Sequence, residues 1–387
     1  MEVRKAYKVQ LYPNKQQEQQ MIKILGCCRF VYNYYLNKRK NYYLENKKSI
    51  SYAELARDLT KFRYTLDWLL ETQTEPLQQS LRRLDKSYGR FFKKQAKFPQ
   101  FKSKKDNRQS FQKHLAWKII DNKIQIQSDL IVKFKGNINK DVKLGTLTIS
   151  KHSSGKWFAS ITAKIEHKQP KEYTKPIGID LGITTLATLS NGKKYPNIKP
   201  QEVLQGKLRK AQQNLARKQI GSNRRKKARQ EVARVYEKIR NIRENHLHQV
   251  SHDIVSKNHA TIAVENLNVK GMLQNRKLAR SLSDVSFGEF LRLLKYKQEW
   301  NGGKIVEIGR FFPSSKTCSF CEFIVETLPL DIRKWKCEKC DTEHDRDVNA
   351  SINILKEAVR QTERGEMEKV SARKELPISV KRRYALA

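Results

Sequence analysis

The feature that most limits the fold of this chain is an apolar strand carrying a single carboxylate, at the start of the run IGIDLGITTLATLSNG at residues 177–192. The apolar residues alternate with Gly178 and Asp180, so Asp180 leaves the strand opposite the apolar side. Residues 184–189 predict a second strand, and the Asn-Gly pair that follows is a strong hairpin signal. An acid on a central strand is costly unless a cation meets it. For this stretch alone, a surface Asp on an edge strand remains an equal alternative.

The charge of the chain predicts a polyanionic partner. Lys and Arg number 80 against 39 acids, for a formal net charge of +41, while 38% of the residues are hydrophobic, enough for folded domains. An idle basic surface is the plainer alternative. No long apolar run and no secretory signal is found, so we expect a cytoplasmic, nucleoid-associated protein without a membrane partner.

The first half of the chain predicts one small β-barrel with a helical block inserted into it. Residues 3–11 and several runs between 117 and 165 alternate as strands do, whereas residues 21–92 follow helical spacing, including a single helix predicted over 52–70. Lys102 and Lys104 belong to a following run in which Lys alternates with Phe, typical of a nucleic-acid surface. A solvated helix end with a few core Phe residues is the alternative.

Two basic helices are predicted between residues 205 and 254, joined near Gly221. Their apolar positions supply one packing side, and the other side carries far more Lys and Arg than acids. This excess indicates phosphate contacts rather than salt bridges, although a solvated helix face would have a similar pattern. The cluster that opens the second helix comprises Arg224, Arg225, Lys226 and Lys227.

Two further acids lie in comparable settings to Asp180. Glu265 is near the end of a buried-type strand over 261–267, and Asp347 opens a helix over 347–359. With a helix over 287–300 and a strand over 304–308, the order fits the RNase H fold, a mixed five-stranded sheet with helices on its faces. In that topology the three acids converge, and carboxylates from separate elements are what two Mg²⁺ ions require.

Four of the six cysteines predict a structural zinc site. Cys318, Cys321, Cys337 and Cys340 form the pattern C-x₂-C-x₁₅-C-x₂-C, in which two pairs supply a tetrahedral thiolate set. Four thiolates close the coordination shell, so we expect a structural rather than a catalytic ion. Cys27 and Cys28 are adjacent on a predicted helix and are interpreted as packing residues.

The motifs together resemble the TnpB family, the transposon-encoded proteins of bacterial and archaeal insertion sequences that are similar to ancestors of type V CRISPR effectors. The similarity spans nearly the whole chain and is carried by IGIDLGI, VENLNVKG, PSSKTCSFC, WKCEKCDTEHDRDVNASINIL, NRRKKARQEVARVYEKIRN, LYPNKQQ, RFVYNYYL and FPQFKSKK.

The resemblance implies an α+β multidomain fold: a wedge β-barrel with an inserted helical recognition domain, then an RNase H-like (RuvC) domain with a zinc-ribbon insert. The implied boundaries are 1–12 and 98–170 for the barrel, 13–97 for the recognition domain, 171–309 and 345–360 for RuvC, 310–344 for the ribbon, and a tail over 361–387 that could be disordered.

The resemblance also implies the activity of an RNA-guided DNA endonuclease that cuts target DNA beside a short motif. Matched by motif, Asp180, Glu265 and Asp347 fall on the catalytic carboxylates of the family, with two Mg²⁺ that Mn²⁺ can replace. The four cysteines fall on the ligands of one Zn²⁺. The partners would be a guide RNA derived from the transposon end and double-stranded target DNA, with one monomer on one RNA.

Further expectations concern the target-adjacent motif, the turns after the cysteine pairs and the alternatives to guided cleavage. Gln78, Gln79 and Tyr52 could read the target-adjacent motif. The family often has Gly after the second Cys of each pair, where a positive φ is easy, and here Glu322 and Asp341 stand instead. A guided DNA-binding repressor without cleavage, a transposase-type protein and an unguided RNA-binding protein remain the alternatives.

Overall fold

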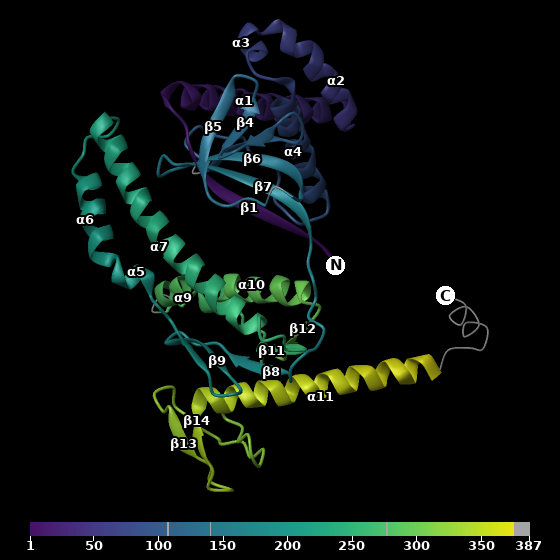
Figure 1. Cartoon of the computed structure of the whole chain (residues 1–387), viewed down its shortest axis with the longest axis vertical. Helices are drawn as coiled ribbons and strands as arrows, with labels where there is room; N and C mark the ends of the chain where they lie inside the picture. Colours follow the sequence, from purple (N-terminus) through teal and green to yellow (C-terminus); the bar gives the residue numbers. More distant parts are fainter. Residues whose placement is uncertain (107, 140, 276–277, 375–387) are drawn as a thin grey trace. The chain divides into compact units, whose positions relative to one another are not determined.

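The chain divides into two compact units in the computed structural model, which describes residues 1–106, 108–139, 141–275 and 278–374 (Figure 1). The N-terminal unit comprises Glu2–Glu166 with Gln213–Arg234. The C-terminal unit comprises Met1, His167–Gln212 and the chain from Val235 onward. Within the described ranges, no helix is both long enough and apolar enough to cross a membrane.

The N-terminal unit is built on a seven-stranded sheet with the order β2-β6-β7-β1-β5-β4-β3. Its longest pairing is antiparallel and joins the first strand to the last, from Glu2 opposite Glu166 to Leu11 opposite Trp157. The strands are β1 (Glu2–Tyr12), β2 (Arg108–Lys113), β3 (Lys118–Ile120), β4 (Lys123–Gln127), β5 (Leu130–Lys135), β6 (Lys143–His152) and β7 (Trp157–Glu166).

The predicted β-barrel is confirmed only in part, as a sheet that does not close within the part of this unit that the structure describes. The sheet is open, and β2 and β3 are its two edges, with no pairing between them. Alternating apolar residues indicate which side of each strand is buried, but they do not determine whether the outermost strands meet. The sheet is therefore a curled half-barrel.

A helical block is inserted between β1 and β2, as predicted. Asn14 begins the first helix through a reciprocal capping box with Gln17, and Ser51 begins the second through one with Glu54. The predicted single helix over 52–70 is wrong, because the backbone becomes extended at Leu66 and interrupts it. The helices are α1 (Lys15–Asn46), α2 (Tyr52–Phe62), the 3₁₀ turn η1 (Arg63–Thr65), α3 (Asp67–Leu70) and α4 (Thr74–Phe92).

The core of the N-terminal unit lies between α1, α4 and the sheet. Cys27 and Cys28 are both buried in it, each 5% exposed. The Thr72 hydroxyl donates to Cys27 Sγ at 3.1 Å, and the Cys28 thiol donates to the Pro76 carbonyl at 3.4 Å. Their interpretation as packing residues is confirmed.

The C-terminal unit contains the predicted mixed five-stranded sheet, with the order β10-β9-β8-β11-β12. Strands β8, β9 and β10 pair antiparallel, whereas β11 pairs parallel with both β8 and β12. The hairpin turn between β9 and β10 contains Gly192, whose φ of 86° favours glycine. The strands are β8 (Ile177–Asp180), β9 (Thr185–Leu189), β10 (Lys194–Pro196), β11 (Thr261–Glu265) and β12 (Lys304–Ile308).

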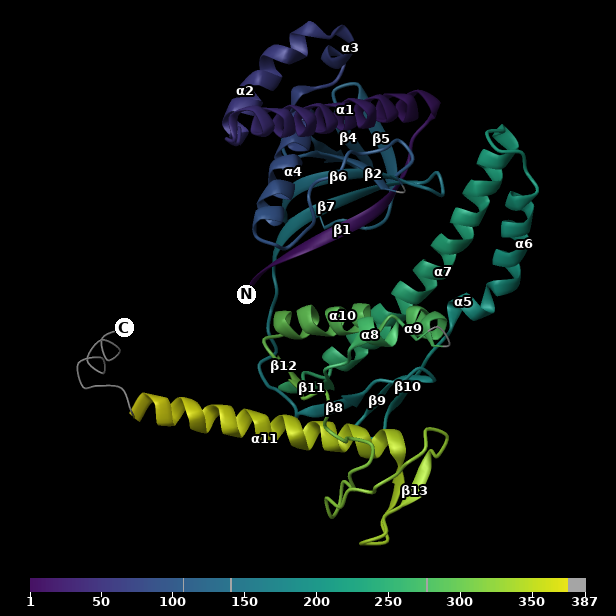
Figure 2. The same ribbon diagram turned by 180° about the vertical axis from the view of Figure 1, so that it is seen from behind.

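Helices cover both faces of this sheet (Figure 2). On one face, α7, α9 and α10 pack against Ile177, Ile179, Ile262 and Val264. On the other face, α11 crosses β9, β8, β11 and β12. The helices are α5 (Pro200–Val203), α6 (Gln205–Ala216), α7 (Asn223–Val255), α8 (Val269–Met272), α9 (Ala279–Val285), α10 (Phe287–Trp300) and α11 (Arg346–Lys374).

A cysteine-rich insert lies between β12 and α11 and contains the antiparallel pair β13 (Lys334–Lys336) and β14 (Glu343–Asp345). The predicted end of the last helix at residue 359 is wrong, because α11 continues to Lys374. Up to residue 364, the last whose burial is described, Ala358 is the last buried apolar residue of α11, and the sequence beyond it is rich in good helix formers that favour continuation of the helix. Residues 375–387 lie outside the described residues.

Candidate active site and cysteine cluster

The register of two parallel strands brings Asp180 and Glu265 together. Ile179 of β8 lies opposite Val264 of β11, and each is followed by its acid at the carboxyl end of the strand. Ile179 and Val264 point into the core formed with α7 and α10. Since successive side chains alternate between faces, both carboxylates leave the sheet on the side covered by α11.

Asp347 joins them from the first turn of α11. The helix begins where the Asp345 carboxylate accepts the Val348 N–H at 3.1 Å, as an N-cap does. Close packing then sets the height of the helix over the sheet: a Cβ added to Gly178 would lie 2.0 Å from the Ser351 carbonyl oxygen. Glycine is therefore required two residues before Asp180, so that the helix start can approach the strand end.

The three carboxylates lie close enough to affect one another electrostatically. Burial first, and then the nearby charges of Glu265 and Asp347, raise the pKa of Asp180 from its ordinary value of 3.8 to about 7. The Leu181 N–H and the Arg346 charge oppose this rise and are smaller effects. The structure thus brings together all three acids predicted from the sequence.

Two residues that contact these acids were not predicted from the sequence. The Ser314 hydroxyl donates a hydrogen bond to Glu265 Oε1. An Arg333 guanidinium nitrogen lies 3.2 Å from Asp347 Oδ1, with most of the arginine side chain exposed. Ser314 belongs to the PSSKTC run that carries the family resemblance, so that motif could have indicated it, whereas no pattern marks Arg333.

The four predicted cysteines form one cluster that could hold a metal ion. Their sulfur atoms all lie within 4.8 Å of one another. Cys318 and Cys340 are 3.6 Å apart at sulfur, as are Cys321 and Cys337. Cys318 and Cys337 are buried, and the other two are half-buried. Each of these two short sulfur–sulfur distances therefore joins a cysteine of the first C-x₂-C pair to a cysteine of the second.

The two residues that replace glycine adopt the backbone conformation that glycine would favour. Glu322 has φ of 63° and Asp341 has φ of 58°. Their N–H groups donate to the carbonyls of Cys318 and Cys337, each at 3.0 Å, so both turns close normally. A positive φ is uncommon for residues other than glycine, and Asp adopts it more often than Glu. The geometry of the cluster is retained despite the substitutions.

Two side chains of the second turn contact the sulfurs. His344 Nε2 lies 3.1 Å from Cys318 Sγ, and its ring packs on Trp335 at 4.8 Å between centroids. Burial lowers the pKa of His344, which favours a neutral ring at neutral pH. The Thr342 hydroxyl lies 3.2 Å from Cys340 Sγ.

One face of α11 holds the first cysteine turn. The Asn349 amide accepts the Ser319 N–H at 2.9 Å and donates to the Thr317 carbonyl at 2.7 Å. Asn353 donates to the same Thr317 oxygen at 2.6 Å, and Lys356 donates to the Ser319 carbonyl at 2.6 Å. These positions share one helix face. The cysteine cluster is therefore fastened to the helix that carries Asp347.

The predicted basic cluster lies at the start of α7, and its four side chains differ in exposure and in hydrogen bonding. Arg224, Lys226 and Lys227 are exposed, and among the described residues none of them forms a salt bridge. Arg225 instead donates to the carbonyls of Leu215 and Lys218, where it closes the turn after α6. Its guanidinium is thus occupied by backbone oxygens.

The other candidate nucleic-acid contacts lie in the N-terminal unit. Tyr52 accepts a hydrogen bond from Arg82 at 2.9 Å and lies under its guanidinium. Gln78 is one turn before Arg82 on α4, so it shares that face. Gln79, next to it, is also half-buried. Tyr52 and Gln78 therefore both lie beside Arg82.

The remaining two predicted contacts lie in the loop after α4. Lys104 is exposed and Lys102 is half-buried, with its ammonium 3.7 Å from the centroid of the Tyr32 ring.

Comparison with known proteins establishes the family. A “Putative RNA-guided DNA endonuclease” of Streptomyces pristinaespiralis is 37% identical over 360 residues, which is 92% of this chain and 89% of the relative. The chain belongs to the TnpB family. A second relative, the “Putative RNA-guided DNA endonuclease InsQ” of Escherichia coli K12, is 31% identical over 383 residues, or 90% of this chain and 91% of the relative.

Family models cover three parts of this TnpB protein. Residues 160–276 match a model described as “Probable transposase”, and residues 287–354 match the TNB domain of Cas12f1-like proteins. Residues 1–48 match a model described as a helix-turn-helix domain, although here they hold β1 and the single helix α1.

A solved structure, the Cas12f1-sgRNA-target DNA complex, supports the fold. It superposes with a TM-score of 0.57 at 14% identity, over 92% of this chain and 99% of that one.

Proposed function

We propose that this TnpB protein is an RNA-guided DNA endonuclease that cuts target DNA by metal-dependent hydrolysis. One observation carries the proposal: three carboxylates from β8, β11 and α11 gather at one end of a sheet, in a chain with a net charge of +41. Clustered acids in a strongly basic protein suit a site that must hold cations next to a polyanion.

The sheet order supports a nuclease domain of the RNase H type, as in RuvC, over residues 171–309 and 345–360. Three antiparallel strands followed by two parallel strands place the carboxyl ends of β8 and β11 side by side. Residues 310–344 would then be a zinc ribbon inserted before the helix that carries Asp347.

The carboxylate site fits Mg²⁺. Its donors are hard oxygens from three elements, and the raised pKa of Asp180 reflects its burial and then the charges of Glu265 and Asp347, both of which a bound cation would offset. When bound, two such ions would activate water and stabilise the leaving 3′ oxygen, with Mn²⁺ able to substitute. Asp180, Glu265 and Asp347 would hold the ions.

The neighbours of these acids have positioning roles. The Ser314 hydroxyl orients the Glu265 carboxylate, and Arg333 holds Asp347 from the insert. Arg333 is mostly exposed, so it is free to exchange its contact with Asp347 for one with a substrate phosphate.

The cysteine cluster fits one structural Zn²⁺. A tetrahedron of sulfurs about 2.3 Å from zinc has edges of roughly 3.8 Å, close to the two separations of 3.6 Å. Four thiolates leave no position for a reacting water, so the ion would stabilise the insert. Through Asn349 and Asn353, the insert in turn braces the start of α11.

The proposed partners are a guide RNA and double-stranded target DNA, with one protein copy on one RNA. Base pairing to the guide would supply sequence specificity, and exposed cations such as Arg224, Lys226 and Lys227 would contact phosphates. Relatives of this chain have names that state the same activity.

The experiment that tests the proposal is to purify the protein from cells carrying its surrounding DNA and to sequence the RNA that remains bound. We expect one dominant RNA with a constant part and an end that can be replaced to choose a new target. A mixture of cellular RNAs in proportion to their abundance would contradict guided action and would favour an unguided RNA-binding protein.

A further inference from the structure

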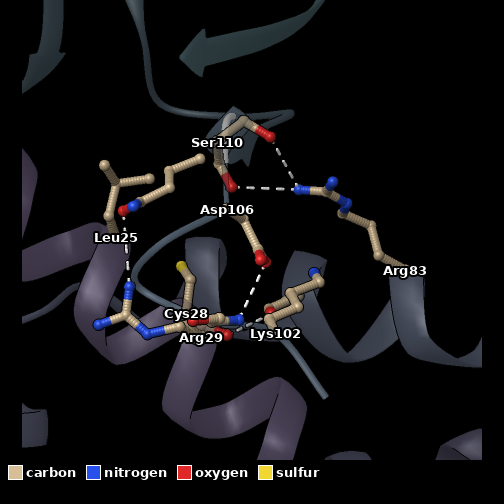
Figure 3. A pocket seen from close by; sticks show the side chains of 10 residues that line it. Leu25, Cys28, Arg29, Arg83, Lys102, Asp106 and Ser110 are labelled. Atoms are coloured by element: carbon tan, nitrogen blue, oxygen red, sulfur yellow. Dashed lines mark hydrogen bonds between the residues drawn. The ribbon is translucent and has the colours of Figure 1, made fainter. Parts of the chain in front are cut away.

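A small pocket in the N-terminal unit gathers three cations that no part of the proposed cleavage site uses. It lies where α1 and α4 meet the loop that precedes β2, and its volume is about 50 Å³. Arg29 enters it from α1 and Arg83 from α4 (Figure 3). The lining residues are Leu25, Cys28, Arg29, Ser80, Arg83, Lys102, Ser103, Asp106, Gln109 and Ser110.

The cations of the pocket are held by neutral groups. Arg83 donates to the carbonyl and the hydroxyl of Ser110, at 3.1 and 3.2 Å, and Arg29 lies 3.5 Å from the amide oxygen of Gln109. Within the described ranges, none of the three cations forms a salt bridge. Two guanidinium groups are therefore oriented without being neutralised.

Lys102 is held just as firmly. Asn33 binds its backbone on both sides, at 2.8 and 2.9 Å, and its ammonium lies over the Tyr32 ring. Asp106 is the one acid among the lining residues, and its carboxylate accepts the Ser103 N–H at 2.9 Å. Counting side chains, three positive charges face one negative charge.

This arrangement costs free energy in the protein alone. Burial first, and then the Arg83 charge, lower the pKa of Lys102 to about 8. Cys28 cannot offset the positive charge, because burial raises the pKa of its thiol to about 12. A site that keeps a desolvated Lys beside an Arg is suited to an anion that pairs with both.

We propose that the pocket of Arg29, Arg83 and Lys102 binds one phosphate group of a nucleic-acid backbone. Roughly 10–15 Å³ of cavity volume holds one water molecule. The pocket, at about 50 Å³, therefore admits a group of a few heavy atoms but not a nucleobase. It would therefore fix the position of a strand without reading its sequence. The nature of the strand rests on the proposed function, whereas the phosphate chemistry does not.

The first experiment uses inorganic phosphate as the probe. We expect it to raise the unfolding midpoint of the full chain saturably relative to chloride at equal ionic strength. Lys102→Met keeps the alkyl stem over Tyr32, removes the charge and should abolish the effect, whereas Lys102→Arg should retain it. Lys105→Gln makes the same charge change on an exposed side chain of the same loop and should leave the effect unchanged.

Fold integrity is checked in the same experiment. Without phosphate, Lys102→Met should unfold no earlier than the parent, because it removes a charge whose burial is unfavourable. Phosphate that stabilises Lys102→Met as much as the parent, or that stabilises neither protein, would overturn the proposal.

The second experiment identifies the strand. Lys102→Met should weaken nucleic-acid binding about equally for all sequences and reduce the slope of log affinity against log salt by about 1. Single uncharged methylphosphonate linkages are then moved along the guide RNA and along the target DNA. One linkage should weaken binding to the parent but not to Lys102→Met, and the strand that contains it is the ligand.

The proposal that the pocket binds a backbone phosphate would be overturned by a slope of log affinity against log salt that is the same in Lys102→Met and the parent. It would also be overturned if no methylphosphonate linkage had an effect that depends on Lys102. Guided cleavage is measured on the same preparation of the parent protein. If the parent cleaves guided target DNA while the pocket tests are negative, the pocket proposal fails and the proposed nuclease function stands.

Discussion

Replacing Asp180 by Asn should stabilise the metal-free protein above neutral pH while abolishing cleavage. The pKa of Asp180 is raised from 3.8 to about 7 by burial and by the charges of Glu265 and Asp347. The folded protein therefore binds this proton more tightly than the unfolded chain does. The stabilising contribution of the Asp180 proton to the free energy of unfolding is fully present below pH 3.8 and is lost as the pH rises through about 7.

The size of the effect follows from the same values. The difference between 3.8 and about 7 corresponds to roughly 4 kcal/mol between the two protonation states, and this is an upper value because the carboxylate is only partly shielded from water. At about 2–4 °C per kcal/mol for a unit of this size, the gain in Asp180→Asn above pH 7 would be several degrees.

The assay is thermal unfolding between pH 5 and 9 in chelator, with the parent and Asp180→Asn side by side. The parent should lose stability across this range relative to the variant, and Mg²⁺ should restore it in the parent alone. A metal-free variant less stable than the parent at pH 8, or one with the same pH dependence, would refute the inference that the three carboxylates repel one another.

Three further predictions concern other parts of the molecule. Cys337→Ser should lose the zinc ion and lower the unfolding midpoint, whereas Cys27→Ser should retain it; unchanged zinc in Cys337→Ser by metal analysis would count against the assignment. Asn353→Ala leaves the Ser314 carbonyl of the insert without its side-chain donor and leaves the Thr317 carbonyl with Asn349 alone, so it should cost about 1–3 kcal/mol in stability, against almost nothing for Gln361→Ala on the same helix. The affinity for RNA should fall steeply with salt, and a slope equivalent to one or two phosphates would exclude a long basic groove.

The central sheet and its acids could be predicted because both follow from local patterns. The two-residue period of a strand determined which side of β8 carries Asp180 and which side of β11 carries Glu265. A carboxylate at the start of an amphipathic helix indicated Asp347. Nothing more than alternation, helix spacing and strand order was needed to expect the three acids together.

Features that depend on contacts between distant segments could not be predicted in the same way. The pocket combines Arg29, Arg83 and Lys102, which have no common spacing in the sequence. Closure of the seven-stranded sheet depends on whether its edge strands meet, which alternation does not encode. The extension of α11 beyond Ala358 has no apolar periodicity, so helix propensity alone would have had to indicate it.

The most direct test of the account is guided cleavage by the parent and by three single variants, Asp180→Ala, Glu265→Ala and Asp347→Ala, with target binding measured in parallel. Binding depends on base pairing and on many phosphate contacts, whereas cutting depends on metal held by these carboxylates. The parent should cut only DNA that matches its guide, in Mg²⁺ and not in chelator, and each variant should bind that DNA without cutting it. A variant that cuts at near the parent rate, or a parent that cuts unmatched DNA equally well, would contradict the account.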